Sequence, residues 1–264
     1  MGRGRSGRIP GAQATAPVQR SEPPVGIDER GFKSSDNSDF HDLYNGREYY
    51  QRQKLTDAER RAATNYVDNA QEGWTPYSHS QNLNHLMREN ARKGLPITTG
   101  MNAKQLDTYN GMMSAMHNLG YNVNLTRYDH AGFVNTLLEK AGVRGADYER
   151  MDINTLRNML VGTRYGEERL ITTSYNNFKN APQSSKDVFM NRAVRIEYRA
   201  RASTKAMMPG DGPGGRMGEV VLAPSGGREN FRVVEVRYDN NVNIRRKGTR
   251  SVSKQKQLVF IVET

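Results

Sequence analysis

Gly210-Asp-Gly-Pro-Gly-Gly-Arg-Met-Gly-Glu219 runs directly into the apolar segment Val220-Val-Leu-Ala-Pro224. A glycine-rich stretch is typical of a loop, and the short apolar run that follows it is typical of a strand. The junction therefore places one carboxylate, Glu219, on the first residue of a strand. This arrangement suits an acid that is held against a substrate.

Two strand ends further upstream also carry polar side chains. Arg127 follows the strand-like stretch 122–126, and the cluster Thr172-Thr173-Ser174 follows the strand-like stretch 168–171. A guanidinium group can hold phosphate oxygens through two parallel hydrogen bonds. A fixed carboxylate stabilises the positive charge that builds on a ribose when its bond to a leaving group breaks. The sequence thus contains, in this order, an arginine, a hydroxyl cluster and a glutamate. These are the functional groups needed to bind a dinucleotide pyrophosphate and break a ribosyl bond.

Helical periodicity dominates the first half of the chain, and strand-like alternation dominates the second. Helices are predicted at 58–69, 80–92, 102–118, 133–141 and 151–161, and further strands at 194–202, 231–236 and 258–262. The third helix turns Leu106, Tyr109, Met113 and Met116 to one face, which we expect to be buried. Helices followed by strands, without regular β–α alternation, predict an α+β fold.

The length of 264 residues suits one large domain with an arm. Residues 1–45 are rich in Gly, Arg, Pro, Ser and Asp, a composition that cannot offset the entropy of ordering and predicts a disordered basic arm. Gly2 and Ser6 match a myristoylation pattern, but the pattern is short and common, so we expect an unmodified flexible arm and keep lipidation as the alternative. The folded domain is expected over 46–264.

The net charge of +11 is concentrated near the C-terminus, because residues 191–264 hold fifteen Lys and Arg against seven Asp and Glu. This basic third favours an acidic partner, either nucleic acid or protein, although ordinary solvated strand faces have the same composition.

Several classes of site and location are disfavoured. The spacing of Gly210, Gly212 and Gly215 matches a dinucleotide fingerprint, but that motif opens a helix and this one contains Pro213 and opens a strand. There is no cysteine, and the five histidines have no metal-site spacing, so we expect no metal. The longest apolar run, 258–262, is too short to span a bilayer, and no secretion signal is visible. Location stays open between the cytoplasm and delivery into a target cell by another machine.

The order, spacing and strand context of these motifs resemble the ADP-ribosyltransferase superfamily, in the branch whose toxins carry an Arg, Ser-Thr-Ser, Glu signature. The resemblance runs from about Leu55 to the C-terminus. It is carried by Tyr66, Asn84 and Arg88, Arg127-Tyr-Asp129, Leu170-Ile-Thr-Thr-Ser-Tyr175, Gly218-Glu-Val-Val-Leu-Ala-Pro224 and Phe231-Arg-Val-Val.

This resemblance implies a helical lobe at about 46–120, a split β-sandwich NAD-binding core at about 121–264, and mono-ADP-ribosyl transfer from NAD with release of nicotinamide. Glu219 would be the catalytic acid, Thr172 would orient it, and Arg127 would bind the pyrophosphate. The other expected contacts to NAD are Tyr128, Thr173, Ser174, Tyr175 and Phe178.

The chain departs from the family pattern in the loop before Glu219. Many relatives carry Glu or Gln two residues before the catalytic glutamate, where it engages the acceptor, but this chain has Met217 and, next to it, Arg216. The acceptor, protein or nucleic acid, is therefore open, as is the choice between toxin and phage effector. Three alternatives remain: an NAD glycohydrolase, a basic nucleic-acid or virion-associated binding protein without NAD turnover, and a fold that binds NAD without chemistry.

Overall fold

The computed structural model describes residues 55–68, 77–119, 122–145, 147–175, 192–209, 218–245 and 252–264. Its helices are α3 (Asp57–Val67), α4 (His79–Arg92), α5 (Ala103–Ala115), α6 (Ala131–Lys140), α7 (Ile153–Leu160) and the short 3-10 helix η1 (Tyr148–Arg150). Its strands are β1 (His117–Asn118), β2 (Val123–Asp129), β3 (Arg164–Tyr165), β4 (Ile171–Ser174), β5 (Val194–Ala200), β6 (Lys205–Met207), β7 (Glu219–Leu222), β8 (Phe231–Arg245) and β9 (Val252–Glu263). The fold is α+β, as predicted.

Local capping fixes where the first helices begin. At α3 the Thr56 amide donates to the Glu59 carboxylate over 2.8 Å, and the Glu59 amide donates back to the Thr56 hydroxyl. Asn102 and Gln105 repeat this reciprocal pair at α5. Each pair satisfies two backbone N–H groups that a helix start leaves without partners.

The third predicted helix was wrong at its end and for one residue of its buried face, since Tyr109, Met113 and Met116 are partly buried against a hydrophobic core. Helix α5 stops at Ala115, since Met116 takes extended backbone angles and His117–Asn118 pairs with β6 instead. Leu106 is 38% exposed, because the helix buries the neighbouring stripe Gln105, Thr108, Met112 and Ala115. The apolar residues alone predicted the wrong centre for the buried face, because polar Gln105 and Thr108 lie on the buried side of the helix.

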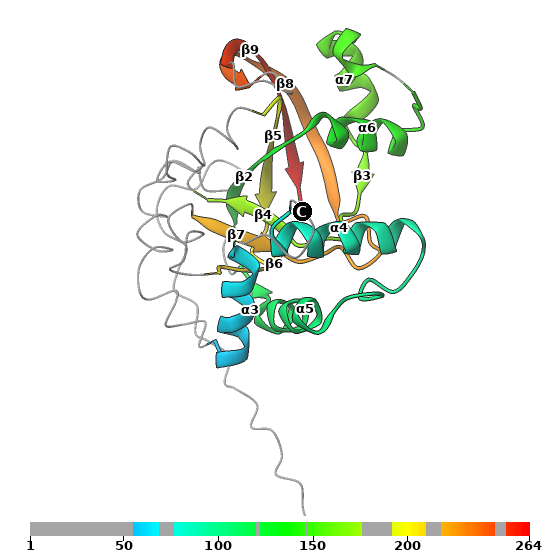
Figure 1. The fold of residues 1–264 in the computed structure, drawn as a ribbon. Coiled ribbons are helices and arrows are strands. Elements are labelled where there is room, and N and C mark those ends of the chain that lie inside the picture. Colours follow the sequence, from blue (N-terminus) through cyan, green and yellow to red (C-terminus); the bar gives the residue numbers. More distant parts are fainter. Residues whose placement is uncertain are drawn as a thin grey trace, which may run out of the picture.

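Nine strands form one hydrogen-bonded sheet in the order β1-β6-β7-β4-β2-β5-β9-β8-β3. All pairs are antiparallel except β5 and β9. Strands β2 and β4 share a single register pair, Thr126 with Ser174, so the sheet divides there into two parts. Figure 1 shows β4, β7 and β6 running across the direction of β5, β8 and β9.

Two apolar cores pack against the sheet, and the larger one includes residues from both of its parts, such as Ile171 and Phe260. The larger core lies between the long strands and helices α6 and α7, and the smaller one joins α3, α4 and α5 to Leu170, Met207 and Val221. Strand β7 contributes to both, because Val220 and Leu222 enter the larger core and Val221 enters the smaller. Burial on both faces explains why the run after Glu219 is continuously apolar.

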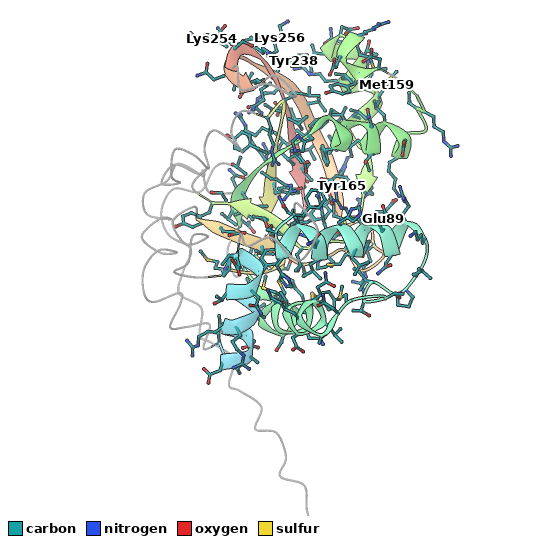
Figure 2. The ribbon with its side chains drawn as sticks, in the orientation of Figure 1. Glu89, Met159, Tyr165, Tyr238, Lys254 and Lys256 are labelled. Carbon is teal, nitrogen blue, oxygen red and sulfur yellow. The ribbon has the colours of Figure 1, made fainter. Side chains whose placement is uncertain are left out.

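The last two strands form a hairpin that is longer than the sequence predicted. Only the apolar part of β9, from Leu258 onward, pairs with β5, and residues 252–257 pair with β8 alone. Lys254 and Lys256 are exposed near its far end, where the Lys256 ammonium lies 5.8 Å from the centre of the Tyr238 ring (Figure 2). Residues 253–257 are all polar, which hid this extension from a search for apolar runs.

None of the helices in the described ranges is both long and apolar enough to cross a bilayer. The expected N-terminal arm at 1–45 lies outside the described residues, so its boundary stays a prediction.

Candidate functional site

The three residues expected to act on NAD lie on neighbouring strands. Arg127 is on β2, Thr172 on β4 and Glu219 on β7, and these strands are adjacent in the sheet. Ser174 is the register partner of both Thr126 and Glu219. Arg127 and the hydroxyl cluster were expected just after strands, but they lie inside β2 and β4, because their backbones pair with β5 and β7.

Glu219 is a buried carboxyl group, with 7% of the residue exposed. Burial raises its pKa to about 7, against the hydrogen bond from Thr172 and the positive charge of Arg127, both of which lower it. Near neutral pH this acid is therefore poised between its two protonation states. Such a shift, caused by desolvation beside a specific cation, is typical of functional carboxyl groups.

A chain of hydrogen bonds runs from the helical lobe to this carboxyl group. The Tyr66 hydroxyl lies 2.9 Å from the Thr172 hydroxyl and 3.3 Å from the carbonyl oxygen of Leu170. Asn84 donates its side-chain N–H to the Tyr66 oxygen over 3.1 Å and accepts from the backbone N–H of Leu170 over 2.9 Å. Tyr66 thereby ties Thr172 to the helical lobe.

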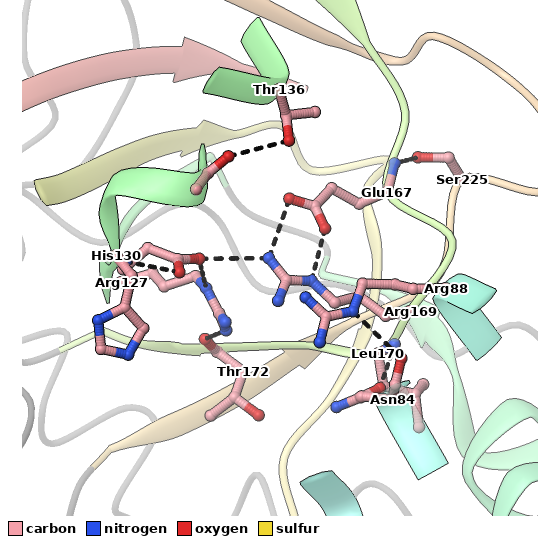
Figure 3. Close-up of polar contacts among 12 residues, drawn as sticks. Asn84, Arg88, Arg127, His130, Thr136, Glu167, Arg169, Leu170, Thr172 and Ser225 are labelled. Carbon is pink, nitrogen blue, oxygen red and sulfur yellow. Dashed lines mark hydrogen bonds and ion pairs between the residues drawn. The ribbon is translucent and has the colours of Figure 1, made fainter. Parts of the chain in front are cut away.

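Arg127 is held by two partners inside the protein. Its Nε donates to Asp129 over 3.0 Å, and its Nη1 donates to the backbone carbonyl of Thr172 over 2.8 Å (Figure 3). The second contact spans the place where β2 and β4 separate. A ligand would meet the remaining N–H groups of Nη1 and Nη2, the end of the guanidinium.

A buried ion-pair cluster stands behind Arg127. Arg169 donates to both oxygens of Glu167, over 2.5 and 3.0 Å, and to Asp129 over 3.2 Å (Figure 3). Burial disfavours the charged forms of Arg169 and Asp129. The carboxylates nevertheless raise the pKa of Arg169, and the two arginines lower the pKa of Asp129. Asp129 thus links Arg127 to a rigid charged core.

The cluster carries a surplus of positive charge. Burial lowers the pKa of Arg88, with a further contribution from Arg169, and burial followed by the charge of Arg127 lowers the pKa of Arg192. Arg88 lies beside Arg169 in Figure 3; part of its side chain is exposed to solvent and part is buried. Four arginines that interact electrostatically with one another favour an anionic ligand.

The remaining expected contacts lie in different surroundings. Tyr128 is buried and accepts a hydrogen bond from Arg192 through its carbonyl oxygen. Thr173 is fully buried and donates to the carbonyl of Val220 over 2.7 Å, so it ties β4 to β7. Ser174 and Tyr175 are also buried, with the Tyr175 amide donating to the Gly218 carbonyl. Phe178, Arg216 and Met217 lie outside the described residues.

Sequence reasoning gave no role to Tyr66, Asn84, Asp129, Glu167 or Arg169. Tyr66 and Asn84 were noted only as part of the resemblance, and Asp129 only as the end of Arg127-Tyr-Asp129. The three consecutive charged residues Glu167-Glu168-Arg169 gave no signal, because such charges are usually solvated.

No group of carboxylate and histidine side chains in the described ranges has the arrangement of a metal site. His79 is buried and its Nε2 lies 2.9 Å from the Thr108 hydroxyl, a structural contact between α4 and α5.

Comparison with solved structures identifies the fold. The C3 exoenzyme of Clostridium limosum superposes with a TM-score of 0.57 at 19% identity, covering 88% of this chain and 96% of the other. An ADP-ribosyltransferase toxin of Paenibacillus larvae gives a TM-score of 0.58 at 17% identity, covering 87% and 98%. An ADP-ribosyltransferase of Clostridium botulinum gives 0.54 at 16% identity, covering 88% and 98%.

Neither a protein-family model nor a curated protein sequence matches the chain. The structural likeness extends over nearly the whole of the solved proteins, and it agrees with the resemblance that the motifs carry. The chain therefore has the fold of the toxin-like ADP-ribosyltransferases.

Proposed function

We propose that this protein is a mono-ADP-ribosyltransferase that uses NAD as substrate. The observation that carries the proposal is the position of Glu219, a buried carboxyl group that interacts electrostatically with Arg127 and accepts from Thr172. A shared fold hosts many functions, so the argument for activity rests on these three groups.

NAD fits the charges of the cluster. Its pyrophosphate is anionic, and the free end of the Arg127 guanidinium offers two N–H groups to phosphate oxygens. Arg88 adds a second, solvent-exposed cation beside Arg169. Asp129 and Glu167 are already neutralised by arginines and would repel the ligand little.

The reaction breaks the bond between the ribose anomeric carbon and the nicotinamide nitrogen. The bonding electrons leave with nicotinamide, and the ribose becomes oxocarbenium-like. Ionised Glu219 stabilises that positive charge, while Thr172 holds the carboxylate in place. The acceptor then forms the new bond to the anomeric carbon and loses its proton to solvent.

The acceptor is proposed to be a macromolecule. The solved structures that share the fold include proteins named as toxins, which supports an effector delivered into a target cell. A phage effector acting on its host remains the second setting. The basic C-terminal third is consistent with an acidic acceptor surface.

Labelled NAD incubated with the protein and a cell lysate tests the proposal. We expect label in a macromolecular fraction, and protease or nuclease digestion then assigns the acceptor class. Glu219→Gln should abolish the labelling, whereas Glu229→Gln, which alters an exposed carboxylate paired with Lys140, should not. Release of free ADP-ribose alone would select a glycohydrolase, and an unchanged NAD pool would overturn the proposal.

A further inference from the structure

Tyr66 links Asn84 to Thr172 in the chain of hydrogen bonds that runs from the helical lobe to Glu219. It lies on α3, more than one hundred residues before β4, and only 1% of it is exposed. Its hydroxyl contacts Thr172, Asn84 and the Leu170 carbonyl at 2.9, 3.1 and 3.3 Å. A buried tyrosine hydroxyl usually finds a hydrogen-bond partner, and the Tyr66 hydroxyl has three, one of which is the Thr172 hydroxyl.

The direction of these hydrogen bonds follows from the donors available. The amide oxygen of Asn84 accepts from Leu170, so its NH2 group faces Tyr66 and can only donate. The Tyr66 oxygen therefore accepts from Asn84 and has one hydrogen to give. Of its two acceptors, the Thr172 hydroxyl is the nearer.

The consequence concerns the single hydrogen of Thr172. When Tyr66 donates to Thr172, the Thr172 hydrogen is left to point at Glu219, whose ionised carboxylate can only accept. When Tyr66 donates to Leu170 instead, Thr172 is free to turn its hydrogen toward Tyr66 and away from Glu219. The orientation of Tyr66 thus decides whether Glu219 receives its hydrogen bond.

We propose that Tyr66 is a positioning residue that directs the Thr172 hydroxyl toward Glu219, so that Asn84, Tyr66, Thr172 and Glu219 form one chain of donors ending at the carboxylate. The role of this chain in catalysis rests on the proposed function, but its hydrogen-bond direction does not. Successive donors in a chain polarise one another, which strengthens the last bond.

Few other groups face Glu219 in the described part of the chain. Arg127 from β2 contributes the positive charge, β4 contributes the uncharged Thr172, and α3 contributes Tyr66. Burial raises the pKa of Tyr66, so its hydroxyl is neutral at physiological pH. Removing that hydroxyl therefore changes hydrogen bonding around Glu219 without changing the charge.

Carbon-13 NMR titration of the Glu219 carboxyl group in the full chain tests this directly. In Tyr66→Phe we expect the pKa of Glu219 to rise by roughly 0.3 to 1 unit, because the last hydrogen bond to the ionised form is weakened. Thr172→Val should raise it by about 1 unit or more, since the donor itself is lost. Thr172→Ser, which keeps a hydroxyl, should restore most of the wild-type value.

The double variant separates a role through Thr172 from a general effect on the core. Tyr66→Phe combined with Thr172→Val should give no larger rise than Thr172→Val alone. The matched control is Tyr165→Phe, which removes an equally buried hydroxyl from the larger core and should leave the Glu219 pKa unchanged. Asn84→Ala, which removes the first donor, gives a second route to the same rise if Tyr66→Phe fails to fold.

An unchanged Glu219 pKa in Tyr66→Phe, or a double variant whose two shifts simply add, would overturn the inference. The titration needs neither NAD nor turnover. A protein that never releases nicotinamide would refute the proposed function and leave this test intact.

Discussion

Asp129 should contribute strongly to stability, although it lies at the edge of the candidate site. The substitution Asp129→Asn keeps the shape of the side chain and removes its charge. Arg127 and Arg169 then lose a shared carboxylate that both contact within 3.2 Å. Both arginine side chains are at most 15% exposed, so water replaces little of that interaction.

The loss in the free energy of unfolding depends on which interactions Arg127 and Arg169 keep in the variant. Breaking a buried ion pair costs about 3–5 kcal/mol, because the partner charge stays buried. Here Arg169 keeps its two hydrogen bonds to Glu167, and asparagine keeps an oxygen that accepts. We therefore expect a loss of about 2–3 kcal/mol in the free energy of unfolding. At an m-value of about 3 kcal/mol per M, the urea midpoint falls by roughly 0.7 to 1 M.

The pH dependence has a definite sign. The arginines lower the pKa of Asp129 in the folded state, so its stabilisation is present above the unfolded pKa of about 3.9 and is lost as the pH falls through the folded value. The difference between wild type and variant should stay constant between about pH 5 and 8 and shrink only in acid.

Urea unfolding at several pH values measures this difference. The control is Glu229→Gln, which breaks a surface pair in which both side chains are about half exposed and should cost less than about 1 kcal/mol. An Asp129→Asn protein that unfolds at the wild-type urea concentration, or a gap that closes between pH 5 and 8, would refute this reasoning.

Three other outcomes are expected. Arg127→Lys keeps the charge but loses the planar fork, so the KM for NAD should rise about ten- to a hundredfold in a nicotinamide-release assay, and an unchanged KM would exclude the phosphate role. Because burial raises the pKa of Glu219 to about 7, the free energy of unfolding should fall as the pH rises from about 4.5 through 7. In Glu219→Gln, this pH-dependent decrease should be smaller by roughly 2–4 kcal/mol, as measured by urea unfolding. Identical pH profiles of the two proteins would contradict the prediction. A Cβ at Gly111 would lie 2.4 Å from the Ala62 Cβ, so Gly111→Ala should cost about 1–3 kcal/mol by thermal unfolding, and Ala62→Gly in the same chain should recover part of it.

The strand run after Glu219 was predictable because its pattern is local. Three consecutive apolar residues can only be satisfied by burial on both faces, and β7 has a core on each side. The strict alternation of 194–200 likewise placed Ile196, Tyr198 and Ala200 in the core. In both cases the residues themselves carry the periodicity.

The polar architecture behind the site was not predictable in the same way. Glu167, Arg169 and Asp129 lie in separate segments, and each looks like a solvated charge until the fold places them together. Gln105 and Thr108 on the inner face of α5 show the same limit, since a polar side chain is buried only when a partner is available there. Local patterns do not reveal such long-range partners.

The sequence alone marks Glu219 as a candidate site residue, because a glycine-rich loop is predicted before it and an apolar strand after it. The fold adds its physical environment, which consists of burial, a hydroxyl donor and a neighbouring cation. The roles of Arg127, Thr172 and Glu219 toward NAD remain predictions.

Nicotinamide release from NAD is the most direct measurement of the central claim. The wild-type protein should release nicotinamide, with a rate that falls as the pH drops below about 7, because Glu219 becomes protonated. Glu219→Gln should lower kcat by at least about a hundredfold while calorimetry still detects NAD binding. Equal nicotinamide release by the wild type and Glu219→Gln would contradict the account.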